Sequence, residues 1–125
     1  DLALMRSGLY FGWVQPNSTV GSTQAALRLA QAAAAPAGAS RVLLLGDSRT
    51  NEGLSLPLAD AGSGGRVHHV RASAAGTTPR VWYYLLREID PRCERFDAVA
   101  LLGSWDHSGD IETGSLVDRP LDLAY

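Results

Sequence analysis

The sequence predicts an α/β fold in which a parallel sheet lies between two layers of helices. Three short runs with strand character, at 41–45, 66–72 and 96–102, are separated by segments with helical composition. Continuous apolar runs are typical of strands buried on both faces, as in parallel sheets. Parallel neighbours also need long, right-handed crossovers, which the intervening helices would provide. The 125 residues, 46% of them hydrophobic, suffice for one core.

The first part of the chain predicts an arm followed by a helix. Residues 1–18 are expected to form an irregular arm, because two glycines and a proline interrupt the apolar residues between 2 and 14 and follow them. The Asn-Ser pair at 17–18 can cap a helix, and residues 19–35 are rich in Ala, Leu, Gln and Arg. A helix is therefore predicted over 19–35, and a loop over 36–40 ends it.

The first strand and the segment after it come next. Residues 41–45 form a continuous apolar run that ends at Gly46, which predicts a strand buried on both faces. Residues 47–53 are interpreted as the turn that leaves this strand. A short helix is predicted over 54–61 with a proline in its first turn, and the glycine-rich stretch 62–65 ends it.

The remaining elements repeat this alternation. Residues 66–72 predict a second strand, and Thr78 followed by a proline predicts the start of a helix over 79–89. Its Trp-Tyr-Tyr run at 82–84 is expected to anchor the helix to the sheet. Residues 96–102 predict a third strand, and the following 108–125 are polar and then weakly helical.

Three loops follow the carboxyl ends of these strands, where open α/β sheets bind ligands. Gly46 is expected to let the chain turn sharply out of its strand, which presents Ser48 near a helix start. Free backbone N–H groups there suit an oxyanion hole, and an exposed Ser48 suits a nucleophile. The alternative is that Asp47 and Ser48 only cap the next helix.

Three sequence blocks on this edge resemble those of the SGNH (GDSL-like) serine hydrolase superfamily. The run 42–48, Val-Leu-Leu-Leu-Gly-Asp-Ser, resembles its first block, and Gly76 falls where the second block has a glycine. The third block reads Gly-x-Asn-Asp in the family, and here residues 103–106 are Gly-Ser-Trp-Asp. The resemblance spans about 41–106 and implies a flavodoxin-like, three-layer α/β/α fold with no cofactor and no metal.

Carried over to this chain, the resemblance implies a role for each matching residue. Ser48, which follows Asp47, would be the nucleophile, and the backbone N–H groups of Ser48 and Gly76 would be oxyanion donors. Trp105 stands where the family has an asparagine donor. Losing one such donor typically costs about 100- to 1000-fold in rate, which argues against efficient catalysis.

The general base is the largest departure from the family pattern. The family takes its histidine from an Asp-x-x-His block near the C-terminus of the domain, and no such block occurs before Tyr125. Residues 19–125 are therefore expected to be the N-terminal portion of a longer domain. His107 is the candidate base within the chain. His68 and His69 lie inside the second predicted strand, one expected on each face, and are interpreted as structural or exposed.

The resemblance predicts an ester hydrolase or acyl (acetyl) transferase acting on a small ester or acylated carbohydrate through a Ser48 acyl-enzyme. The run 46–50 with Gly53, followed by the helix at 81–87, resembles a bacterial, membrane-anchored branch of the superfamily. This resemblance would place an anchor upstream of Asp1 and the domain outside the cytoplasm. Two alternatives stay open. One is a noncatalytic SGNH-like binding module of an envelope protein, and the other is a flavodoxin-like domain that binds a nucleotide or phosphate.

Charge and spacing argue against other classes. The formal net charge is -2 with no long run of one sign, so no nucleic-acid partner is expected. Asp106, His107 and Asp110 lack a spacing that would converge on a metal ion. The glycine-rich 61–65 stretch precedes a predicted strand, whereas phosphate loops join a strand to a helix, so it is interpreted as a linker.

Overall fold

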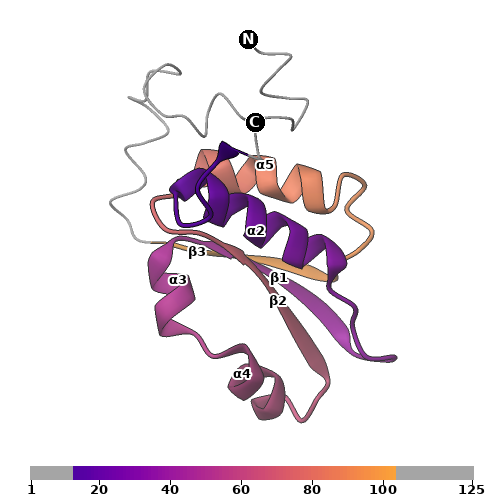
Figure 1. Cartoon of the computed structure of the whole chain (residues 1–125). Coiled ribbons are helices and arrows are strands. Elements are labelled where there is room, and N and C mark those ends of the chain that lie inside the picture. Colours follow the sequence, from indigo (N-terminus) through magenta and orange to yellow (C-terminus); the bar gives the residue numbers. More distant parts are fainter. Residues whose placement is uncertain (1–12, 104–125) are drawn as a thin grey trace.

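The computed structural model describes residues 13–103, which form one parallel sheet with helices on both faces (Figure 1). The strand order is β2-β1-β3. The strands are β1 (Ser40–Gly46), β2 (Val67–Ser73) and β3 (Ala98–Leu102). Helices α2 (Thr19–Ala32) and α5 (Pro79–Ile89) cover one face, and the short helices α3 (Ser48–Gly53) and α4 (Leu56–Gly62) lie on the other. The predicted three-layer α/β architecture is confirmed.

The central strand β1 is buried on both of its faces, as its apolar run predicted. Leu43, Leu44 and Leu45 are all buried. Val42 pairs with His69 of β2 and with Ala98 of β3, so β1 is bonded on both sides. Such a strand has no solvent face, which is why its sequence shows no polar alternation.

The main core lies between β1, β2 and the helices α2 and α5. Its buried members are Leu27, Ala30, Leu43, Leu45, Val70, Ala72, Val81, Trp82, Leu85 and Ile89. Of the aromatic run expected to anchor α5, Trp82 is 3% exposed and does so, whereas Tyr83 is 54% exposed. Helical geometry explains this difference, because adjacent residues in a helix point in directions about 100° apart.

Helix α2 begins where predicted and ends three residues early. The Ser18 hydroxyl accepts a hydrogen bond from the N–H of Gly21 at 3.1 Å, so the expected cap forms. The helix ends at Ala32 rather than at residue 35. Pro36 disfavours helical geometry in the residue before it, and the guanidinium of Arg95 donates to the Gln31 carbonyl at 2.9 Å.

Residues 47–53 were expected as the turn that leaves β1, with the next helix only at 54–61, but residues 48–53 already form helix α3. Six residues are too few for a hydrophobic period to show in the sequence. Arg71 of β2 stabilises the end of the helix by donating to the carbonyl oxygens of Asn51 at 3.2 Å and Leu54 at 3.1 Å. Helix α4 follows, with Pro57 in its first turn as expected.

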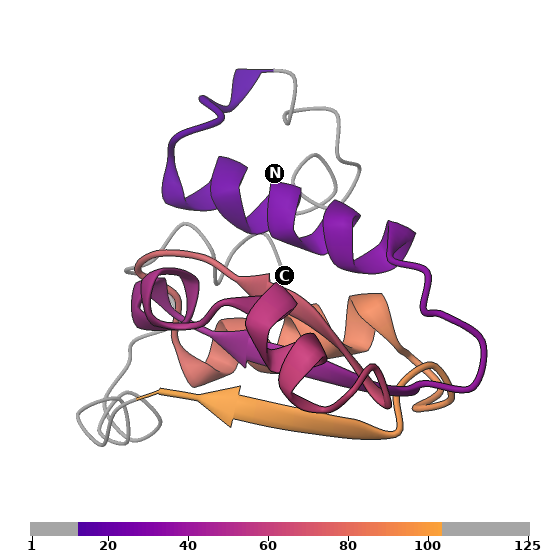
Figure 2. The same cartoon turned by 90° about the horizontal axis from the view of Figure 1, so that it is seen from below.

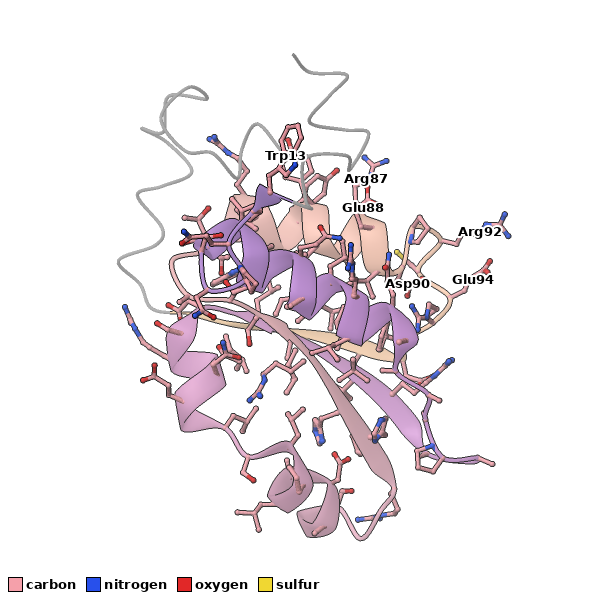
Figure 3. All side chains as sticks on the ribbon, viewed as in Figure 1. Trp13, Arg87, Glu88, Asp90, Arg92 and Glu94 are labelled. Carbon is pink, nitrogen blue, oxygen red and sulfur yellow. The ribbon has the colours of Figure 1, made fainter. Side chains whose placement is uncertain are left out.

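The junction between α5 and β3 is built around a buried carboxylate. Asp90 accepts the backbone N–H groups of Glu94 and Arg95, both at 2.9 Å, and of Phe96 at 3.3 Å. Burial raises the pKa of the Asp90 carboxyl, but these hydrogen bonds outweigh it and hold that pKa below its usual range. Figure 3 shows the side chains of Arg92 and Glu94 extending outward from this junction.

Both histidines of β2 contact the same carboxylate. The Nδ1 atoms of His68 and His69 lie 3.0 and 2.6 Å from the Asp60 carboxylate oxygens. The Asp60 side chain also accepts the backbone N–H of His69 at 2.9 Å. Because β2 is an edge strand and Asp60 lies at the end of α4, one carboxylate can reach both imidazoles.

Strand β3 forms the other edge of the sheet and is largely uncovered. Val99 and Leu101 are 41% and 64% exposed. Helix α2 packs on β2 and α5 packs on β1, and Figure 2 shows β3 running along one edge of the sheet. No helix within residues 13–103 is long and apolar enough to cross a membrane.

Candidate functional site

Ser48 is the first residue of α3, directly after the carboxyl end of β1. The Asp47 side chain accepts the Arg49 N–H at 2.9 Å and so caps the helix, and the Arg49 guanidinium lies 3.7 Å from the other Asp47 oxygen. Ser48 is half-buried, and its hydroxyl makes no hydrogen bond to another residue of 13–103. Of the two residues that could have been caps, Asp47 therefore serves as one and Ser48 does not.

Gly46 is required at the end of β1 for a different reason from the one expected. Its φ is not among the positive values, so it supplies no left-handed turn. A Cβ atom at this position would meet the Thr50 side chain and would lie 2.6 Å from the Leu102 carbonyl oxygen. Glycine thus allows the first turn of α3 and the end of β3 to approach β1 closely.

Gly76 lies in the loop after β2, at the same end of the sheet as Ser48. Its φ of +72° is left-handed, and the loop is exposed at Ala75 and Gly76. The next residue, Thr77, is buried and bonds to β1 through its hydroxyl, which lies 3.1 Å from the Gly46 carbonyl oxygen. The Ser48 and Gly76 turns thus lie at the same end of the sheet, after the carboxyl ends of β1 and β2 (Figure 1).

Two further contacts fix helix α3 between the outer strands. The Thr50 hydroxyl donates to the Leu102 carbonyl at the end of β3, at 3.1 Å. On the other side, the Ser73 hydroxyl donates to the Asn51 side-chain oxygen at 2.6 Å. These bonds restrain rotation of α3 about its axis and hence the direction in which Ser48 points.

The site as described contains no imidazole. His68 and His69 lie near the start of β2, and the Ser48 turn lies beyond its other end. At about 3.3 Å per strand residue, the four residues from His69 to Ser73 place that imidazole more than about 10 Å away along the strand. His107, Trp105 and Asp106 lie outside the described residues, as does the third loop beyond Gly103.

Thr50, Asn51, Ser73 and Thr77 are the residues at this edge that sequence reasoning did not single out. Each is a hydroxyl or amide residue within five positions of a strand end. That composition is common to loops in general, so it marks no site by itself. Only the sheet register shows which of these residues meet.

Neither the metal-binding residues nor the surface hollow of the described chain points to the Ser48 turn. Within residues 13–103 no group of three or more His, Cys, Asp or Glu side chains is placed to hold a metal ion. An open hollow of about 340 Å³ lies at the opposite end of the sheet, lined by Ala35, Pro36, Gly38, Ala39, Arg41 and Asp97. Its position separates it from the Ser48 turn.

Comparison of the chain with protein-family models, with curated proteins and with solved structures finds no match.

Proposed function

We propose that this chain carries the nucleophile edge of an SGNH-type serine ester hydrolase or acyl transferase, with Ser48 forming the acyl-enzyme. The observation that carries the proposal is a half-buried Ser48 hydroxyl at the carboxyl end of the central strand, left without a partner in residues 13–103 because Asp47 caps the helix. The resemblance of the run 42–48 to the first SGNH block supports the same assignment.

The chemistry begins with attack of the Ser48 oxygen on the carbonyl carbon of an ester. A base takes the hydroxyl proton, the carbon–oxygen bond to the alcohol breaks, and the alcohol leaves with a proton. Water or an acceptor alcohol then removes the acyl group from Ser48. Backbone N–H groups of Ser48 and Gly76 would stabilise the negative oxygen of each tetrahedral intermediate.

The base is the part of the proposal that rests on the sequence alone. No histidine of residues 13–103 lies at the Ser48 edge, which leaves His107 as the candidate within the chain. The expected substrate, a small ester or acylated carbohydrate, follows from the resemblance to the superfamily.

A serine-reactive fluorophosphonate probe tests the assignment on the full-length protein. Wild type should be labelled, and Ser48→Ala should not. Ser55→Ala is the matched control, because Ser55 is an exposed serine at the start of α4 with no side-chain cap bond. Equal labelling of wild type and Ser48→Ala would exclude Ser48 as the nucleophile. A His107→Ala variant that labels as fast as wild type would exclude His107 as the base.

The second candidate function is a noncatalytic SGNH-like binding module. Two observations favour it, namely Trp105 in place of the family's asparagine and the lack of an imidazole at the described edge. It predicts that wild type reacts no faster with the probe than Ser48→Ala, while an acylated glycan still binds. Tight nucleotide binding unaffected by Ser48→Ala would instead favour the flavodoxin-like alternative.

A further inference from the structure

Resting on the proposed function, we propose that Thr77 is a positioning residue of this site. Its buried hydroxyl fixes the Gly76 turn against the end of β1, and so sets the distance between the Gly76 backbone N–H and the Ser48 oxygen. Thr77 need not touch substrate to do this.

The Thr77 hydroxyl has three polar neighbours, although the residue is only 1% exposed. Its oxygen lies 2.7 Å from the Ala74 carbonyl oxygen and 3.1 Å from the Gly46 carbonyl oxygen. The Trp82 indole N–H donates to the same oxygen at 2.9 Å. Since a hydroxyl has one hydrogen, the Trp82 donor occupies a lone pair and the hydrogen is directed toward the two carbonyl oxygens.

This arrangement links three elements through one side chain. Gly46 ends the central strand two residues before Ser48, Thr77 follows Gly76 directly, and Trp82 belongs to the buried face of α5. The Ala74 N–H also donates to the Gly46 carbonyl, at 3.3 Å. The Gly76 turn is thus joined to the Ser48 turn by two hydrogen bonds to the same carbonyl oxygen.

Nothing else of comparable strength restrains the tip of this turn in residues 13–103. Ala75 and Gly76 are exposed, and the atoms nearest to a Cβ built on Gly76 belong to the Thr19 side chain, at 3.7 Å. A turn with a left-handed glycine at its tip keeps one geometry only when its flanks are fixed. Thr77 is the buried residue that fixes one side of this turn.

A positioning role and a merely structural role predict different results for paired substitutions. Thr77→Val keeps the shape and removes the hydroxyl, whereas Thr77→Ser keeps the hydroxyl and removes a methyl group. If Thr77 only stabilises the fold, both variants should label with the fluorophosphonate probe at the wild-type rate while folded. If it positions the turn, Thr77→Val alone should label slowly.

The experiment measures the rate at which the probe phosphorus bonds to the Ser48 oxygen with loss of fluoride, at a temperature where each full-length variant is folded. We expect Thr77→Val to lower this rate at least about tenfold, since small displacements of catalytic groups have effects of this size or more. Thr77→Ser should restore most of the rate. Asp90→Ala, which weakens the opposite end of the sheet, is the control for lost stability.

Each possible result either supports or overturns the proposed role of Thr77. A Thr77→Val rate equal to wild type, or a fall matched by Asp90→Ala at equal stability, would overturn it and leave Ser48 as the nucleophile. Absence of labelling in wild type would overturn the proposed function itself. If Thr77→Val does not fold, Thr77→Ala takes its place, because it also removes the hydroxyl; a wild-type rate in that variant would overturn the positioning role.

Discussion

The two ends of the sheet are fastened by different chemistry. At the amino end, carboxylates accept several hydrogen bonds each, as Asp90 does from three backbone N–H groups and Asp60 from two histidines. At the carboxyl end, the bonds between loops come from neutral side chains, chiefly Thr50 and Thr77. Charge-assisted bonds are the stronger kind. We infer that the amino end contributes more to stability, and that the carboxyl end determines the geometry around Ser48.

The largest expected effect is at the amino end. Asp90→Ala removes the acceptor of three backbone N–H groups in a buried turn, and should lower the free energy of unfolding by about 3 kcal/mol. Urea unfolding measures this, with Glu88→Ala on the exposed side of α5 as the control. A loss no greater than that of the control would contradict the inferred division between the two ends.

At the carboxyl end, a large loss of stability should come from a steric clash rather than from a lost hydrogen bond. In Gly46→Ala the new methyl group meets the Thr50 side chain and the Leu102 carbonyl, so we expect a loss of about 2 kcal/mol and slower labelling of Ser48. Gly53→Ala is the matched control, because no atom lies within 4 Å of a Cβ at that site. In a helix this control should be neutral or slightly stabilising. Equal effects of the two substitutions would show that close approach at Gly46 is unimportant.

Acid should weaken the amino end selectively. Burial raises the pKa of Asp60, but hydrogen bonds from His69 and His68 outweigh it, so the pKa values of Asp60 and Asp90 both lie below the usual range. Their stabilising effect is therefore fully present above the ordinary carboxyl pKa, near about 4, and is lost as pH falls through the lower folded values.

Urea midpoints between about pH 7 and pH 3 measure this loss. Asp90→Asn should be less stable than wild type at neutral pH and should lose less stability on acidification, because one of the two shifted carboxyls is gone. Parallel pH profiles for wild type and Asp90→Asn would show that Asp90 does not contribute to acid unfolding.

The smallest expected effect is a difference in stability between variants of two adjacent residues, the helix cap Asp47 and the proposed nucleophile Ser48. Asp47→Ala should cost about 1 kcal/mol because the N–H of Arg49 loses its acceptor. Ser48→Ala should change the free energy of unfolding by less than about 0.5 kcal/mol while abolishing probe labelling. Thermal or urea unfolding of the two variants provides the comparison. If Ser48→Ala were as destabilising as Asp47→Ala, the Ser48 hydroxyl would have a structural bond and its role as a free nucleophile would lose its support.

The sequence allowed the strands and the two long helices to be predicted, with errors of a few residues at their ends. The apolar run at 41–45 predicted a fully buried central strand, and the cap at Ser18 predicted the start of α2. Helix α3 was missed because six residues carry no readable period. Thr78 stands at the N-cap position of α5 as predicted, but its side chain makes no capping bond.

Composition and local pattern thus determined the order of elements and placed Ser48 and Gly76 after the carboxyl ends of two strands of a parallel sheet. Only the tertiary structure decided that Thr77 bonds to Gly46, 31 residues away, and Thr50 to Leu102, 52 residues away. The reason is physical. Hydrophobic periodicity records which face of an element is buried, whereas the partner of a hydroxyl group depends on strand register and on the position of each crossover, which no local pattern contains.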